Sequence, residues 1–142
     1  MIQRIQSVWL FLAAMLNGLL FISKLYHYNK GAEVVHEGVR NSGNIFLFIL
    51  AAFITVLPLI AIFFFGDRKR QKGITWLSAI FSISFIAVVV TTTTNLSNQV
   101  PPVNVQYDFG LLLPVVSIIF LFLALRGIRK DEKLIKSLDR LR

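Results

Sequence analysis

Residues 45–65 read IFLFILAAFITVLPLIAIFFF, a run without a single charged side chain. An α-helix needs about 20 apolar residues to cross roughly 30 Å of hydrocarbon. Open strands would leave backbone N–H and C=O groups unpaired in lipid, so a run of this kind is helical. The stretch therefore predicts a transmembrane helix.

Three more apolar stretches have a similar character. The expected spans are residues 5–25, 45–65, 74–94 and 109–125. None contains an acidic residue, and Lys24, close to one end, is the single basic one. The pattern predicts an all-α membrane protein with four transmembrane helices in an up-down-up-down bundle, because a short link makes the second and third helices antiparallel neighbours.

The composition also favours lipid over a packed protein interior. Hydrophobic residues make up 56% of the chain and charged residues 15%, against roughly half and a quarter in soluble domains. A globular core of this size could not bury all 13 phenylalanines. The chain has no cysteine, which excludes disulfides, thiolate metal sites and cysteine nucleophiles.

Lysine and arginine are unevenly distributed between the connecting segments. Twelve of the 15 precede the first span, separate the second from the third, or follow the fourth; the others are Lys24, Lys30 and Arg40. Cytoplasmic segments carry the excess of basic residues, so both termini are expected in the cytoplasm. The same placement accounts for the net charge of +8 without a nucleic-acid partner.

An alternative interpretation of the first span is a cleaved signal peptide, because Arg4 precedes an apolar run. However, residues 21–26 (FISKLY) contain no small-x-small cleavage site, and the run is longer than a usual signal sequence. We therefore expect the span to be retained.

The C-terminal segment of the chain is amphipathic. On a helical wheel one side carries Leu134, Ile135, Leu138 and Leu141, and the other carries Lys133, Lys136 and Arg140. We expect residues 131–142 to form a tail beyond a transmembrane domain of residues 1–130. Either the tail lies on the inner leaflet facing anionic lipid, which the pattern favours, or it docks to another protein.

A second basic cluster, Arg68, Lys69 and Arg70, lies in the link between the second and third spans. It is interpreted first as a determinant of topology and second as a contact for anionic lipid headgroups.

A few polar residues and prolines interrupt the spans. Asn17, Ser78 and Ser82 are expected to serve helix packing and interhelical hydrogen bonding. Pro58 and Pro114 are expected to bend the second and fourth helices. The spans hold no Asp, Glu, His or buried Arg, which counts against a pump or an ion-coupled carrier.

The outer loops hold the remaining titratable cluster: His27, Glu33, His36 and Glu37. The ligand chemistry of these residues would allow a zinc or copper site, but their spacing matches no metal motif, so no metal and no cofactor are assigned. Residues 103–107 (VNVQY) alternate like a strand after the turn-forming Pro101 and Pro102. We expect this strand to pair with Val34 and Val35 in a small sheet.

Both ends of the chain carry a family resemblance. Residues 1–7 (MIQRIQS) and 129–142 (RKDEKLIKSLDRLR) resemble an uncharacterised family of small four-helix membrane proteins of Bacteroidota, a domain-of-unknown-function family. The resemblance covers the whole chain in length and span order. It implies a Gram-negative inner membrane with the outer loops in the periplasm, and it brings no catalytic residues.

The sequence favours a non-catalytic membrane subunit or accessory protein of a larger inner-membrane complex, bound to anionic lipids and to other membrane subunits. The alternative is a small-solute or lipid transporter acting as a homo-oligomer. An enzyme ranks third, because no His, Asp, Ser or Lys side chains cluster for acid–base or nucleophilic chemistry.

Overall fold

The computed structural model describes residues 3–30, 33–98 and 104–139. These residues are mostly helical. The helices are α1 (Gln3–Gly18), α2 (Ile45–Phe63), α3 (Arg68–Ser97) and α4 (Leu112–Asp139). The short 3-10 helix η1 (Leu19–Phe21) extends α1, and η2 (Phe109–Leu111) precedes α4. The strands are β1 (Lys24–Lys30), β2 (Glu33–Gly38) and β3 (Val105–Tyr107).

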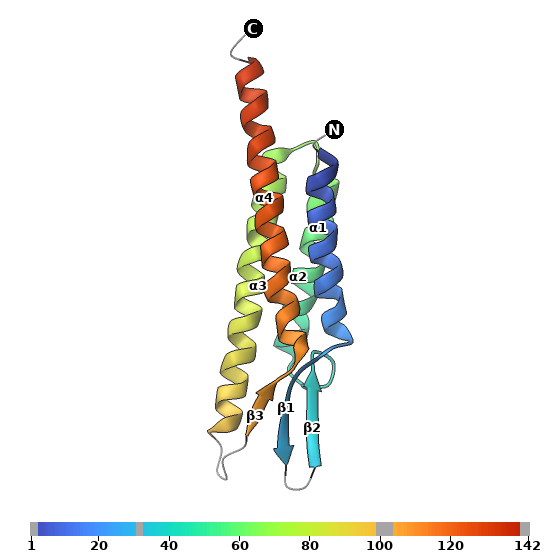
Figure 1. Ribbon diagram of the computed structural model, residues 1–142, viewed down its shortest axis with the longest axis vertical. Helices are drawn as coiled ribbons and strands as arrows, with labels where there is room; N and C mark the ends of the chain where they lie inside the picture. The colour runs from blue at the N-terminus through green and yellow to red at the C-terminus, as the bar shows by residue number, and fades with distance from the viewer. Residues whose placement is uncertain (1–2, 31–32, 99–103, 140–142) are drawn as a thin grey trace.

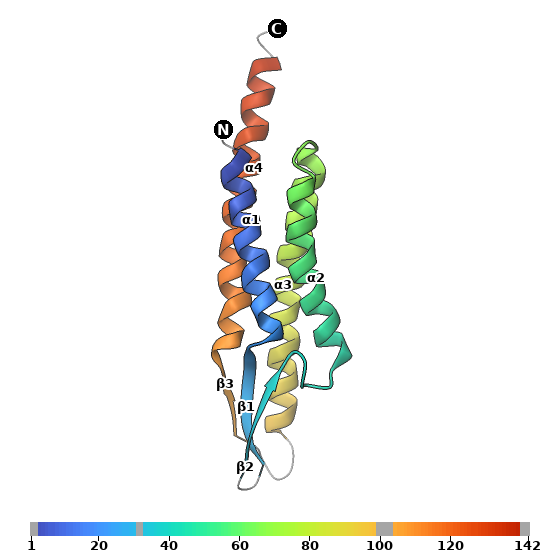
Figure 2. The ribbon, with the colours of Figure 1, turned by 90° about the vertical axis from the view of Figure 1, so that its right-hand side faces the viewer.

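The helices form a bundle in which consecutive helices run in opposite directions (Figure 1). Each helix packs against the next along the chain, and α4 also packs against α1. The strands lie at one end of the bundle, and α4 projects beyond the other helices at the opposite end (Figures 1 and 2). One buried cluster, containing Leu47 and Phe85, adjoins the sheet; a second is built around Leu10 and Leu121.

The outward faces of the helices are apolar as well. Phe11, Phe53, Ile80 and Ile119, one from each helix, are 47–56% exposed. An apolar surface of this extent is unusual for a protein surrounded by water. Three segments, Ile45–Phe63, Arg68–Ser97 and Phe109–Leu134, are long and apolar enough to cross a membrane, whereas the apolar helix Ile5–Phe21 is shorter.

The expected end of the first span is wrong. The α-helix ends at Gly18, the 3-10 helix ends at Phe21, and Lys24 already belongs to β1. Tyr26 and Tyr28 alternate with His27 and Asn29, which is the two-residue period of a strand. The apolar residues that lead into this segment obscured that pattern.

The expected link between the second and third spans is also too long. Helix α2 ends at Phe63, and α3 begins at Arg68 instead of residue 74. Asp67 caps α3, since its Oδ1 accepts a hydrogen bond from the Arg70 backbone N–H at 3.2 Å. A carboxylate is favourable at a helix N-terminus, so the basic cluster forms the first turn of α3.

Helix α4 does not stop at residue 125, and no boundary falls at residue 130. It continues to Asp139 along one axis (Figure 1), so the tail is not a separate element over this range. The expected tail contacts Arg140 and Leu141, and the side chains of Ile135, Lys136 and Leu138, lie outside the described residues. Pro114 is the third residue of α4, where a helix has no N–H partner to lose. The expected bend at Pro114 is therefore wrong.

The three strands form an antiparallel sheet of order β2-β1-β3. A small sheet therefore exists, but Val34 and Val35 pair with Asn29 and Tyr28 of β1 and not with β3. One face packs on the bundle: Tyr26 is 2% exposed and lies in the cluster that contains Phe85. Burial raises the pKa of the Tyr26 hydroxyl, and Glu37, opposite it in the sheet, raises it further.

The Asn17 side chain supplies a hydrogen bond that Pro58 cannot give. Pro58 lies inside α2 and has no N–H, so it gives the Ile54 carbonyl one turn earlier no helical hydrogen bond. The Asn17 side chain of α1 is fully buried, and its Nδ2 donates to that carbonyl oxygen at 2.9 Å. This contact joins α1 to α2 and satisfies a carbonyl that lipid could not.

The other two polar residues expected to serve packing, Ser78 and Ser82, are both buried on α3. The Ser82 hydroxyl donates to the Ser78 carbonyl at 2.9 Å, within the same helix.

We expect Asn17→Leu to lower the free energy of unfolding by about 1 kcal/mol, since interhelical hydrogen bonds in membrane proteins contribute roughly 0.6 to 1.7 kcal/mol. Pro58→Ala restores an N–H in α2, so in that background the same substitution should cost less. Unfolding by SDS titration in mixed micelles measures both costs. Equal costs in the two backgrounds would contradict the pairing of Asn17 with the carbonyl at Pro58.

Candidate functional site

The end of the bundle opposite the sheet carries the excess positive charge. By sequence, the segments before residue 5, between residues 65 and 74, and after residue 125 hold 12 basic and four acidic residues, whereas the rest of the chain holds three of each. The net charge of +8 therefore comes from the first group of segments. In the described structure this cationic end consists of residues 67–72 at the start of α3 and residues 126–134 of α4.

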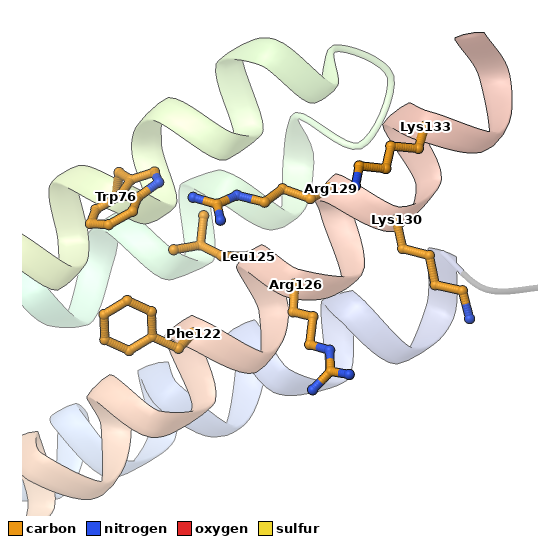
Figure 3. A pocket seen from close by; sticks show the side chains of 7 residues that line it. All are labelled: Trp76, Phe122, Leu125, Arg126, Arg129, Lys130 and Lys133. Atoms are coloured by element: carbon orange, nitrogen blue, oxygen red, sulfur yellow. The ribbon is translucent and has the colours of Figure 1, made fainter. Parts of the chain in front are cut away.

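A hollow of about 600 Å³ lies between α3 and α4 at the cationic end (Figure 3). Its apolar lining is Trp76 of α3 with Phe122 and Leu125 of α4, and its charged lining is Arg126, Arg129, Lys130 and Lys133. We call this site the cationic hollow. It places an apolar surface beside four positive charges.

The aromatic lining of the cationic hollow is held by ring contacts. Trp76 and Phe122 meet edge to face with centroids 5.9 Å apart. The guanidinium carbon of Arg129 lies 5.9 Å from the centroid of the Trp76 ring. A cation over an indole face is attracted by the ring quadrupole, so Trp76 positions Arg129 at the hollow.

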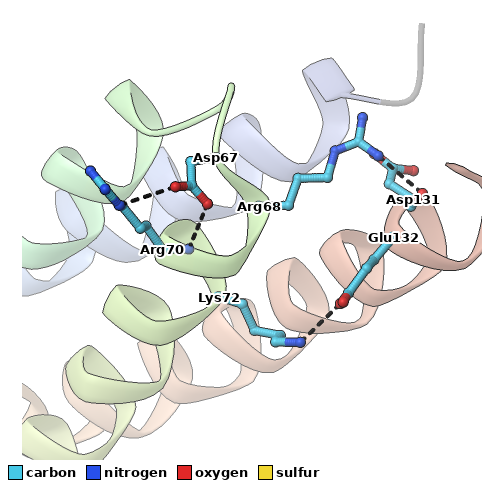
Figure 4. Close-up of polar contacts among 6 residues, drawn as sticks. All are labelled: Asp67, Arg68, Arg70, Lys72, Asp131 and Glu132. Carbon is cyan, nitrogen blue, oxygen red and sulfur yellow. Dashed lines mark hydrogen bonds and ion pairs between the residues drawn. The ribbon is translucent and has the colours of Figure 1, made fainter. Parts of the chain in front are cut away.

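A set of polar contacts fixes α4 where it leaves the bundle (Figure 4). Asp131 is buried, and its Oδ2 accepts from Gln6 Nε2 of α1 at 2.6 Å. The Arg68 guanidinium donates to the Asp131 carbonyl at 3.0 Å, and Lys72 Nζ lies 2.8 Å from Glu132 Oε2. These contacts tie α1 and α3 to the first turns of the projecting part of α4.

The basic residues expected to contact lipid or a partner have different surroundings. Arg68 contacts Asp131, Arg70 Nε lies 3.0 Å from Asp67 Oδ2, and Lys69 is exposed. Lys133 lines the hollow, and Leu134 is exposed beside it.

The four cations of the hollow have no acidic partner in the part of the chain that the structure describes. Across residues 3–30, 33–98 and 104–139, no ion pair involves Arg126, Arg129, Lys130 or Lys133. Arg126, Arg129 and Lys130 were expected only to determine topology, and their place in the lining of the hollow was not predicted. Their spacing with Lys133 (i, i+3, i+4, i+7) places all four on one side of a helix, and that signal was available.

At the sheet end the structure separates the expected titratable cluster. His27 and His36 are direct partners across β1 and β2, and Asp108 joins them. Glu33 and Glu37 lie an odd number of residues from His36, so they belong to the other face of β2. Burial raises the pKa of the Glu37 carboxyl. Asp108 was not expected in this group.

The described residues form a small, mostly helical protein in which three helices are long and apolar enough to cross a membrane. Over residues 2–141 the chain matches the family described as "Domain of unknown function (DUF4293)", and it belongs to that family. No curated protein matches the chain at significant similarity.

Proposed function

We propose that the protein is a non-catalytic integral membrane protein of a bacterial inner membrane. Its four helices cross the bilayer with the cationic end in the cytoplasm, and it serves as a subunit or accessory protein of a larger complex. The observation that carries this proposal is the concentration of the net charge of +8 at one end of an apolar bundle, since excess Lys and Arg mark the cytoplasmic side.

The length of the first helical segment supports a fourth span. The apolar part of this segment is Ile5–Phe21, which corresponds to about 21 Å of α-helix and about 6 Å of 3-10 helix η1. The sum of about 27 Å is slightly less than the roughly 30 Å of bilayer hydrocarbon, a difference that local thinning of the bilayer accommodates. Met15 and Leu19, near the end of this segment, are about half exposed, as lipid-facing side chains are.

The cationic hollow suits an anionic phospholipid. Its four cations would face the phosphate, while Trp76 and Phe122 would contact the upper part of an acyl chain. Basic residues near a membrane surface attract anionic lipid. This role extends the lipid contact inferred from the basic tail to residues of the bundle itself.

The direction of α4 favours a partner for the tail. From Arg126 to Asp139 the helix continues along its axis, and its end lies roughly 9 Å beyond Lys133, the last residue that lines the hollow. A helix in this direction stands away from the leaflet, where another protein can reach it. This direction supports docking over a helix lying on the membrane surface.

Alkaline phosphatase fusions test the topology. We expect activity from fusions after Asn41 and Asn98, where the chain is periplasmic in this proposal, and none from fusions after Arg70 or Arg142. The fusion after Asn41 tests specifically whether α1 spans the bilayer. Strong activity after Arg70 or Arg142 would refute the orientation, and an inactive Asn41 fusion would refute the first span.

Gentle detergent extraction followed by native mass spectrometry tests the role. A stoichiometric foreign subunit that is lost when residues 133–142 are deleted supports the proposal. A homo-oligomer without a foreign subunit, together with solute flux after reconstitution in liposomes, would replace it with the transporter alternative.

A further inference from the structure

Three metal-ligating side chains from distant parts of the chain meet on the outer face of the sheet. His27 of β1 and His36 of β2 are direct cross-strand partners, with ring centroids 5.2 Å apart. Asp108 follows β3, and its backbone N–H donates to the Leu25 carbonyl at 2.9 Å. One ligand atom from each of the three side chains lies within 4.8 Å of the others.

The Asp108 carboxylate is directed at both imidazoles. Its Oδ1 lies 3.1 Å from His27 Nδ1, and its Oδ2 lies 3.5 Å from His36 Nδ1. Asp108 occupies the N-cap position of η2, yet its side chain makes no capping hydrogen bond. Its Oδ2 is buried and has no hydrogen-bond partner among the described atoms. This oxygen therefore has an unused lone pair beside the His36 imidazole.

We propose that His27, His36 and Asp108 bind a divalent transition-metal ion, with Zn²⁺ as the best match. Two imidazole nitrogens and one carboxylate oxygen are typical zinc ligands, and three protein ligands leave a fourth position for water or another ligand. Ca²⁺ and Mg²⁺ require more oxygen ligands than this cluster offers.

The position of the cluster allows an ion to enter. The His36 side chain is 39% exposed, so an ion can reach it from solvent. The antiparallel register of β1 and β2 holds the two histidines side by side before an ion arrives. Modest side-chain movement would bring the ligand atoms to the 2.0–2.2 Å typical of zinc bonds. This site is independent of the proposed membrane role.

Isothermal titration with ZnCl₂ tests the site on the full-length protein in detergent, purified without a polyhistidine tag and treated with a chelator. We expect one ion per chain. His36→Ala and Asp108→Asn should each weaken binding by at least about 100-fold, since loss of a second-shell partner alone costs 10- to 100-fold. Glu33→Gln is the matched control, because it removes a carboxylate from the other face of β2, and binding should be unchanged.

Co²⁺ provides a second measurement on the unaltered chain. A bound ion with two imidazoles and a carboxylate should give the intense visible absorption of a four-coordinate site, and Zn²⁺ should abolish it. The proposal is overturned if the wild-type protein binds neither ion stoichiometrically. Equal Zn²⁺ affinity in the wild type and in folded Asp108→Asn would also overturn it, and Asp108 would then serve only to hydrogen-bond the histidines.

Discussion

Replacing Arg126, Arg129, Lys130 and Lys133 together with glutamine is expected to abolish any preference of the protein for anionic over zwitterionic lipid at the cationic hollow. Each basic residue near a membrane surface contributes about 1 kcal/mol of attraction to anionic lipid. Loss of four such residues corresponds to about 4 kcal/mol, or roughly a thousandfold weaker binding. Glutamine keeps the helix propensity and most of the side-chain length.

The fluorescence of Trp76 reports this binding, because its ring lines the hollow. The measurement should be made in a Trp9→Phe background, so that Trp76 is the one remaining tryptophan. In the wild type the ring centroids of Trp9 and Phe120 lie 5.5 Å apart, and phenylalanine keeps an aromatic ring at this position. In vesicles, brominated phosphatidylglycerol should quench Trp76 more strongly than brominated phosphatidylcholine. The glutamine variant should show equal quenching by both lipids.

Two control variants separate the hollow from the general charge of the protein. Lys69→Gln removes an exposed cation at the same end, and Lys24→Gln with Arg40→Gln removes cations at the sheet end. Both should keep the preference for the anionic lipid. Equal quenching by the two lipids in the unaltered hollow, or an unchanged preference in the fourfold variant, would exclude a lipid site there.

The helices were predictable where hydrophobicity changes abruptly. The expected second span, 45–65, differs from α2 only by the turn residues Phe64 and Phe65. By contrast, the apolar segment that continues α1 is interrupted only by Ser23 and Lys24 before Leu25 and Tyr26, which are buried in the core of the bundle. Hydrophobicity does not distinguish lipid contact from burial in protein, so β1 was read as part of a helix.

The two sites differ in how far local pattern determines them. The cations of the hollow share one helix, so their spacing contains the information. Trp76 could not be assigned to them, because its position depends on the packing of α3 against α4. The cluster at the sheet end depends on strand register and on Asp108, which lies 81 positions after His27. No local pattern relates residues so distant, and only the folded chain brings them together.

Gly110→Ala is expected to be the most destabilising single substitution considered, with a loss of about 3 kcal/mol or more. Gly110 is buried in η2, and a Cβ there would collide with the backbone carbonyl of Lys24. A backbone atom yields less readily than a flexible side chain, and overpacking in well-packed cores costs about 1–3 kcal/mol even where side chains can move. The nearby hydrogen bond from Asp108 N–H to the Leu25 carbonyl further limits any shift.

Gly73→Ala is the matched control, because nothing in the described structure lies within 4 Å of a Cβ at Gly73. Alanine in a helix interior is favoured over glycine by about 0.5–1 kcal/mol, so this variant should be more stable than the wild type. Thermal and SDS-induced unfolding in detergent measure both changes. Unaltered stability of Gly110→Ala would show that η2 does not approach β1 closely. In that case the approach that holds Asp108 beside His27 would also be lost, and the Zn²⁺ site would lose its third ligand.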